Sequence, residues 1–124
     1  MLAWMRAQMR RFTNTVIWSW RGVTATWASE ATFRQWVLAN ILSAIAAFAL
    51  PLDTPERALI LALGLLVLAA ELINTAVETV VNMIAPEAHP MAAKAKDCGS
   101  ACVALTAIAA GVAWLVILWG LWAG

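Results

Sequence analysis

Residues 57–84 read RALILALGLLVLAAELINTAVETVVNMI, a run of Leu, Ala, Val and Ile that is long enough to cross a bilayer as one helix. At about 100° per residue, five polar residues of its second half fall on one stripe: Glu71, Asn74, Thr75, Glu78 and Asn82. A carboxylate at membrane depth costs about 2–3 kcal/mol or more and by default marks a functional site. Two glutamates on one face, with an amide between them, therefore indicate ion binding or the movement of charge.

The composition indicates an integral membrane protein. The 124 residues are 64% hydrophobic and 12% charged, with a mean hydropathy of +0.82, and a soluble domain of this size could not bury so much apolar surface. The eight tryptophans suit the headgroup zone of a bilayer, and the net charge of +1 gives no reason to expect nucleic acid as a partner. Cys98 and Cys102 lie four residues apart, a spacing unsuited to a disulfide, and are expected to be small packing residues.

Three transmembrane spans are predicted, at residues 33–50, 57–84 and 98–122, each near the ~20 residues that cross the hydrocarbon core. Residues 1–30 precede them and mix arginines with Trp, Met, Phe and Ile, which is the composition of an amphipathic helix lying in the membrane surface. The predicted fold class is an all-α membrane protein. It has a single membrane domain over residues 1–124, with an N-terminal surface helix and three transmembrane helices.

The connections between the spans carry signals for helix starts and ends. Asp53 or Thr54 is expected to cap the second span, with Pro55 in its first turn. The second connection, residues 85–94, contains two prolines and therefore cannot form one regular helix.

Basic residues predict the orientation in the membrane. Five arginines lie before or at the start of the first span, Lys94 and Lys96 flank the second connection, and no basic residue follows the third span. Only Arg57 flanks the first connection. We therefore expect the N-terminus and the second connection to be cytoplasmic and the C-terminus to be periplasmic.

The polar residues converge near the predicted cytoplasmic surface. Glu30 precedes the first span, Glu78 lies about two turns from the cytoplasmic end of the second, and Glu71 lies ~10 Å deeper at ~1.5 Å per residue. A further group opens the third span: Lys94, Lys96, Asp97 and Ser100. Mg²⁺ binds a few carboxylates together with substrate phosphates, a lysine can neutralise phosphate charge, and a buried glutamate can take a proton from a hydroxyl. This arrangement suits phosphoryl transfer, although no GxxxxGK phosphate-binding loop is present.

Other interpretations stay open at this point. The glutamates of residues 57–84 could pair with basic residues of a neighbouring helix, and Asn74 could simply hold helices together, as in a purely structural oligomer. A small proton-coupled transporter would also carry an intramembrane glutamate, but it would not need a cytoplasmic cluster of Glu30, Lys96 and Asp97.

Three segments resemble the prokaryotic diacylglycerol kinase family, in order and at the right spacing. Residues 71–78, ELINTAVE, match its signature E-x-x-N-[ST]-[AS]-[IV]-E. Residues 29–35, SEATFRQ, resemble its NEAAFRQE segment, and residues 95–101, AKDCGSA, resemble its AKDMGSA segment. The resemblance extends from about residue 11 to residue 119.

The resemblance implies an activity and an assembly. Members of the family transfer the γ-phosphate of MgATP to the hydroxyl of a membrane lipid, usually diacylglycerol, giving phosphatidic acid at the bacterial inner membrane. They are homotrimers of three-span subunits with active sites shared between subunits. Relatives that phosphorylate undecaprenol share these motifs, so a polyprenol acceptor remains an alternative, although the basic N-terminal segment favours diacylglycerol.

The resemblance also implies roles for individual residues. Glu71 would be the base that activates the lipid hydroxyl, and Asn74 would orient that base or the ligands of the metal. Glu30 and Glu78 would hold Mg²⁺ on the ATP phosphates, which Lys96 would contact. Further nucleotide contacts would come from Arg11, Trp18, Glu87, His89 and Asp97. The path of the lipid headgroup would involve Arg11, Ser19, Arg34 and Ser100.

Two positions depart from the family pattern. Trp36 stands where the family often has an acid, which leaves headgroup contacts at that position unsupported. Asn82 stands where the family usually has Asp, which removes one charge near the metal, while Glu78 remains.

Overall fold

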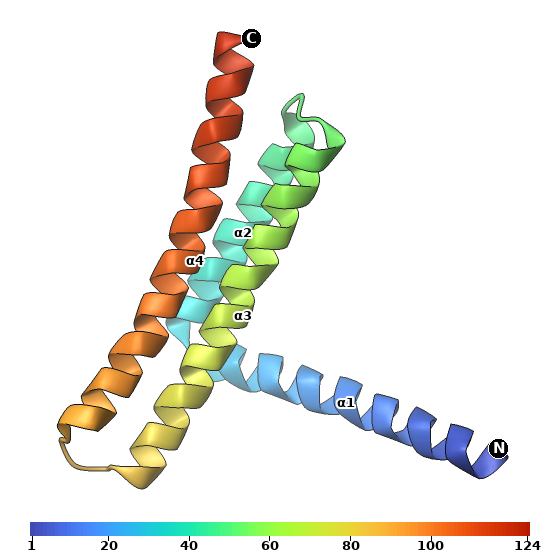
Figure 1. The fold of residues 1–124 in the computed structure, drawn as a ribbon, viewed down its shortest axis with the longest axis vertical. Coiled ribbons are helices and arrows are strands. Elements are labelled where there is room, and N and C mark those ends of the chain that lie inside the picture. The colour runs from blue at the N-terminus through green and yellow to red at the C-terminus, as the bar shows by residue number, and fades with distance from the viewer.

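The computed structural model describes residues 1–124 and contains four helices and no strand: α1 (Leu2–Ser29), α2 (Ala31–Ala49), α3 (Thr54–Ile84) and α4 (Pro90–Ala123). Helices α2, α3 and α4 form an antiparallel bundle, and α1 projects sideways from the start of α2, while the connected ends of α3 and α4 extend beyond that point (Figure 1). α3 packs against both α2 and α4 and is the central helix. The predicted all-α class is confirmed.

α3 and α4 are the two helices that are long and apolar enough to cross a membrane. Only 22% and 17% of their most apolar segments are buried within the chain, so most of their apolar surface faces outward. α2 occupies the predicted first span, but Arg34, Gln35 and Asn40 make it less apolar than the other two. That α2 crosses the membrane therefore stays a prediction.

The turn between α2 and α3 has the predicted cap. The Asp53 carboxylate accepts a hydrogen bond of 2.8 Å from the Glu56 N–H, and the Glu56 carboxylate accepts one of 2.9 Å from the Asp53 N–H. This reciprocal capping box satisfies two backbone donors that the helix start leaves free. Pro55 lies in the first turn, as expected.

Arg57 ties the end of α2 to the start of α3. Its Nε donates to the Ala47 carbonyl at 2.9 Å, and its Nη2 donates to the Leu52 carbonyl at 3.0 Å. The guanidinium lies 5.3 Å from the centre of the Phe48 ring, which is within the range of a cation–π contact. A basic residue that flanks this turn thus satisfies carbonyls that the end of α2 leaves unpaired.

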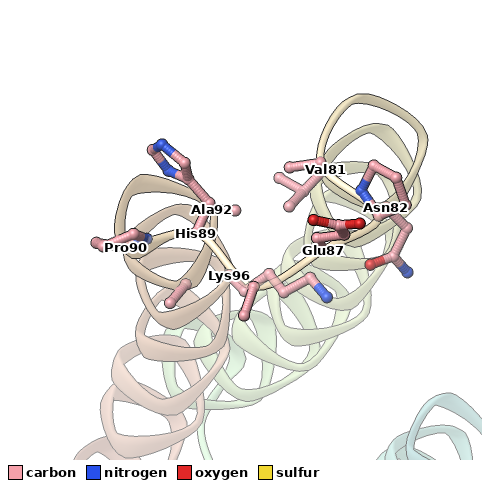
Figure 2. Close-up of a pocket in the computed structure, with 11 residues that line it drawn as sticks. Val81, Asn82, Glu87, His89, Pro90, Ala92 and Lys96 are labelled. Atoms are coloured by element: carbon pink, nitrogen blue, oxygen red, sulfur yellow. The ribbon is translucent and has the colours of Figure 1, made fainter.

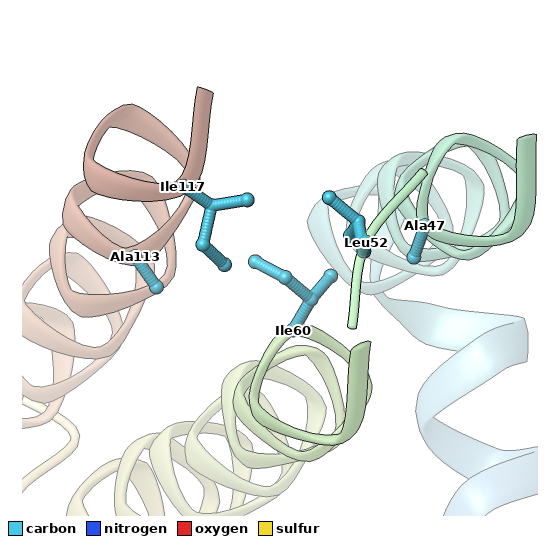
Figure 3. Packing of buried hydrophobic residues seen from close by; sticks show 5 residues of the cluster. All are labelled: Ala47, Leu52, Ile60, Ala113 and Ile117. Carbon is cyan, nitrogen blue, oxygen red and sulfur yellow. The ribbon is translucent and has the colours of Figure 1, made fainter. Parts of the chain in front are cut away.

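The apolar core is small and occupies the end of the bundle near this turn. It consists of Ala47, Leu52, Ile60, Ala113 and Ile117, with Ile60 of α3 and Ile117 of α4 pointing toward each other (Figure 3). Beside it, Trp114 of α4 donates a hydrogen bond of 2.8 Å from its ring nitrogen to the Ser43 hydroxyl of α2. The other half of the bundle, called here the polar half, combines buried apolar side chains such as Phe33 and Val103 with the polar stripe of α3.

α4 begins earlier than predicted, at Pro90 rather than at residue 98. Proline suits the first turn of a helix, and the His89 ring caps this one, its Nδ1 accepting from the Met91 N–H at 3.1 Å. The connection is therefore limited to residues 85–89, and the expected loop over residues 85–94 was too long. As a consequence, Lys94 and Lys96 lie on a helix.

α1 is one continuous helix, which confirms the helix predicted over residues 1–30. Nη1 of Arg34 donates to the carbonyls of Trp27 and Ala28 at 2.6 and 3.4 Å, so α2 supplies partners for the last carbonyls of α1. Glu30 lies at the joint, between the two helices. The position of α1 in the membrane surface stays a prediction.

Candidate active site

A cavity of about 400 Å³ lies in the polar half of the bundle, between α2, α3 and α4. Four of its lining residues carry the predicted chemistry: Glu30, Glu71, Asn74 and Glu78. Ser100 of α4 and Trp36 of α2 complete its polar wall. The polar stripe of α3 thus faces a cavity within the protein.

Two close contacts between helices set the width of this part of the bundle. A Cβ on Gly99 of α4 would overlap the amide of Asn74 on α3, and a Cβ on Gly64 of α3 would overlap the amide of Asn40 on α2. Glycine at both positions lets the helices approach closely. Gly64 and Glu71 are seven residues apart and share a face of α3, so these contacts hold the polar stripe between the neighbouring helices.

Glu71 is the buried carboxylate of the cavity. Its side chain is 5% exposed, whereas Glu30 and Glu78 are half-buried. The Trp36 indole lines the same cavity as the Glu71 carboxyl, and the carboxylates of Glu78 and Glu30 are near enough to interact with that carboxyl electrostatically. A carboxylate in such surroundings is shielded from water and adjoins other acidic groups. These are the surroundings expected of a general base or of a carboxylate beside a metal site.

Asn74 presents a buried acceptor without a partner. Its Oδ1 is buried and makes no hydrogen bond within the chain. Leaving such an atom unsatisfied costs about 1–3 kcal/mol, and an exception of this kind calls for an explanation, such as an ion or water. This oxygen lies against Gly99 of α4, so the contact between α3 and α4 beside the cavity contains an acceptor without a donor.

The residues present fit a hard divalent cation. Carboxylate oxygens are ligands that Mg²⁺ accepts, and Glu30 and Glu78 offer them around one cavity, with Asn74 also in its lining. No three His, Cys, Asp or Glu side chains of the chain lie close enough to hold an ion by themselves. Mg²⁺ does not need three such side chains, because it is usually held by one or two carboxylates, with phosphates and water as further ligands.

A second cavity, of about 630 Å³, lies between the end of α3 and the start of α4. The side chains of Asn82, Glu87 and Lys96 face the space between the two helix ends, whereas the His89 ring lies on the α4 side (Figure 2). Glu78 of the first cavity and Asn82 of the second are four residues apart, about one turn along α3. The two cavities therefore follow each other along the same helix.

Comparison with known proteins identifies the family. A sequence profile of the prokaryotic diacylglycerol kinases matches residues 17–118. The chain belongs to the prokaryotic diacylglycerol kinase family. Diacylglycerol kinase of Pseudomonas aeruginosa is 43% identical over 114 residues, covering 90% of this chain and 91% of the relative. The diacylglycerol kinase of Escherichia coli K12 is 39% identical over 109 residues, covering 88% of this chain and 89% of the relative. The diacylglycerol kinase of Helicobacter pylori 26695 is 31% identical over 111 residues, covering 90% of this chain and 83% of the relative.

Family membership agrees with the fold and makes the chain a membrane protein and a kinase. The matched region includes all of α2 and α3 and most of α4, and so both cavities. The relatives are kinases by name and come from several bacteria.

The structure divides the predicted site residues of this kinase between its two cavities. Glu30, Glu71, Asn74, Glu78 and Ser100 line the first cavity. Glu87, His89 and Lys96 line the second, so Lys96 does not share a cavity with Glu30, Glu71 and Glu78 within one chain.

The remaining predicted residues line neither cavity. Asp97 is exposed on α4, and Arg34 is occupied at the α1–α2 joint. Arg11, Trp18 and Ser19 are exposed on α1. Cys98 and Cys102 are free, as expected, but exposed, so the expectation that they pack inside was wrong for a single chain.

Two residues of the first cavity that could contact a ligand were not predicted from the sequence. Thr32 and Trp36 both line it, although the sequence marks Trp36 only as a departure from the family pattern. They lie four residues apart, so they share a face of α2. No local pattern, however, shows that this face of α2 is turned toward Glu71.

Proposed function

We propose that the protein transfers the γ-phosphate of MgATP to the hydroxyl of diacylglycerol, giving phosphatidic acid and ADP. The chain is a member of the prokaryotic diacylglycerol kinase family, and its relatives carry that activity in their names. The observation that supports the chemistry best is the buried Glu71 in a cavity that it shares with Asn74, Glu78 and Glu30.

In this proposal Glu71 is the general base. Its carboxylate takes the proton of the lipid hydroxyl as the hydroxyl oxygen forms a bond to the γ-phosphorus and the bond to the ADP oxygen breaks. Burial suits this role because it keeps water, the competing acceptor, away from the reacting phosphate. Asn74, one turn along α3, orients the carboxylate or the oxygen ligands beside it.

Glu30 and Glu78 are the residues that would hold Mg²⁺, with Asn74 Oδ1 as a further oxygen nearby. The ion would neutralise charge on the phosphates. Lys96 would contact the same phosphates from the second cavity, which Glu87 and His89 also line. Further nucleotide contacts would come from these two residues and from Asp97, which follows Lys96 in the sequence. Ser100 and Arg34 would lie along the path of the lipid headgroup, with Ser19 and Arg11 contributed by α1.

The active unit in this proposal is a homotrimer. The division of Glu71 and Lys96 between two cavities, and the outward-facing surfaces of α3 and α4, support a site completed by a second subunit. The exposed Arg11 and Trp18 on the projecting α1 would then reach a neighbouring subunit's nucleotide. Three bundle helices alone are too few to enclose a nucleotide and a lipid.

The proposed setting is the bacterial inner membrane. α2, α3 and α4 would each cross it, with α1 lying in the cytoplasmic surface. The basic residues on α1 and at the start of α4 support a cytoplasmic N-terminus and a periplasmic C-terminus.

Purified protein in mixed micelles, given radiolabelled ATP, Mg²⁺ and either diacylglycerol or undecaprenol, tests the proposal directly. We expect labelled phosphatidic acid and a higher kcat/KM for diacylglycerol. If labelled undecaprenyl phosphate is the preferred product, the protein is still a lipid kinase, but its acceptor is undecaprenol rather than diacylglycerol. No labelled lipid from either acceptor, with folded protein, would refute the proposed function.

A further inference from the structure

Trp36 borders two different spaces. It lines the polar cavity that contains Glu71, and it also lines an apolar crevice of about 190 Å³ further along the bundle. The crevice is lined largely by small or apolar residues, among them Ala39, Val67 and Trp114. The indole therefore stands where the acidic part of the bundle meets its apolar part.

The neighbours of Trp36 limit its movement. Phe33, one turn before it, is 3% exposed and fixes which face of α2 is turned inward. Asn40, one turn after it, donates a hydrogen bond of 2.9 Å from its side chain to the Trp36 carbonyl. The Asn40 amide in turn lies against Gly64, where α2 and α3 come closest. The ring consequently projects from a section of α2 that is held against α3.

The chemistry of an indole suits the needs of Glu71. Glu71 adjoins two other carboxylates, and no lysine or arginine lines its cavity. The indole N–H is a donor that cannot accept a proton, so it can hold one carboxylate oxygen without competing as a base. It is also uncharged, so it leaves the full negative charge on the carboxylate, whereas a lysine or arginine would form an ion pair.

We propose that Trp36 is a positioning residue of the kinase reaction, whose indole N–H holds one oxygen of the Glu71 carboxylate so that the other faces the lipid hydroxyl. This inference rests on the proposed function. It assigns a role to a residue of this chain that supplies no ligand to the metal and no contact to the nucleotide.

Two substitutions separate this role from simple packing. Trp36→Phe keeps an aromatic ring and loses the N–H, whereas Trp36→Gln keeps an N–H donor and loses the ring. Positioning predicts that kcat falls about tenfold in Trp36→Phe, the effect of one lost hydrogen bond, with the KM for MgATP unchanged. It also predicts that Trp36→Gln is the more active of the two. If Trp36→Phe is the more active variant, Trp36 acts by packing and the inference is wrong.

Trp114→Phe is the matched control. Trp114 is also half-buried, and its ring nitrogen donates to Ser43, away from Glu71. We expect its kcat to stay within about twofold of the unmodified protein, because a lost hydrogen bond away from the reaction changes stability rather than the barrier. An equal loss of kcat in both tryptophan variants would show a general effect on the bundle and would overturn the inference.

A double-mutant cycle gives a second, independent measurement. If Trp36 acts only through Glu71, Trp36→Phe should cause no further loss of kcat in a Glu71→Gln background, because coupled residues are not additive. A full additional tenfold loss would refute the coupling. Failure of the proposed function is distinct from both results, because the unmodified protein would then phosphorylate no lipid at all.

Discussion

Gly99 of α4 lies so close to Asn74 of α3 that a Cβ at position 99 would overlap the Asn74 amide oxygen. That oxygen is the buried acceptor that finds no partner in the chain. The amide oxygen of Asn74 thus points at α4, against Gly99, beside the cavity that Asn74 lines. One glycine thus links the packing of two helices to the orientation of a group beside the proposed base.

Gly99→Ala should therefore impair catalysis more than folding. The added methyl group must displace Asn74 or separate the helices, and a misplaced polar group near the reaction costs about tenfold or more in rate. We expect kcat to fall by at least about that factor, while helix content by circular dichroism is unchanged.

Gly120→Ala serves as the control for this prediction. It adds the same methyl group to α4 at a position where nothing lies within 4 Å, so its kcat should match that of the unmodified protein. Full activity in Gly99→Ala would mean that the position of Asn74 has no role in the rate.

Glu71→Gln should nearly abolish turnover. The amide keeps the shape of the side chain but cannot take a proton, and general base catalysis contributes about 10²–10⁴-fold. Nucleotide binding, measured by equilibrium titration with MgATP, should remain because Glu71 lies apart from the second cavity. Turnover at the normal rate in this variant would remove Glu71 as the base.

Glu78→Gln should raise the Mg²⁺ concentration needed for half-maximal rate and also lower that rate. A neutral amide is a weaker ligand than a carboxylate for a hard cation, and the chain offers few others nearby. Titration of activity with Mg²⁺ at saturating ATP measures the shift. Glu56→Gln is the control, since glutamine preserves the capping box at the far end of α3, and a Mg²⁺ curve identical in both variants would argue against a metal at Glu78.

Arg57→Met should destabilise the fold and leave the chemistry intact. It removes the hydrogen bonds to the Ala47 and Leu52 carbonyls, and leaving partly buried acceptors unpaired costs about 1–3 kcal/mol. Unfolding in detergent should show this loss, while kcat measured on folded protein stays the same because Arg57 lines neither cavity and lies about 21 Å along α3 from Glu71. Lys94→Met, which removes an exposed cation, should not change the unfolding free energy measurably.

Local signals made parts of this fold predictable. Asp53 and Pro55 indicate the start of α3, and the spacing of Glu71, Asn74 and Glu78 is enough to place them on one face of a helix. The predicted start of α4 was wrong because Pro90 does not end regular structure in this chain. It occupies a first turn that the His89 ring caps.

Contacts between helices could not be predicted from the sequence. The close approaches of Gly64 to Asn40 and of Gly99 to Asn74 depend on the register of separate helices, which no local pattern specifies. The same register decides that Lys96 opens into a different cavity from Glu71. The sequence can therefore identify the charged residues of such a site without showing which of them share a cavity.

That division makes subunit mixing the decisive test of a shared site. Glu71→Gln and Lys96→Met each inactivate a site in the proposal, but they fall in different cavities of one chain. If a site takes Glu71 from one subunit and Lys96 from its neighbour, a mixed trimer contains at least one site with both residues intact. Refolding the two inactive variants together should therefore restore part of the activity, with a maximum near equal proportions, whereas separately refolded variants combined afterwards should stay inactive. Mixed trimers, verified by differently tagged subunits, that remain inactive at every ratio would place the whole site within a single chain.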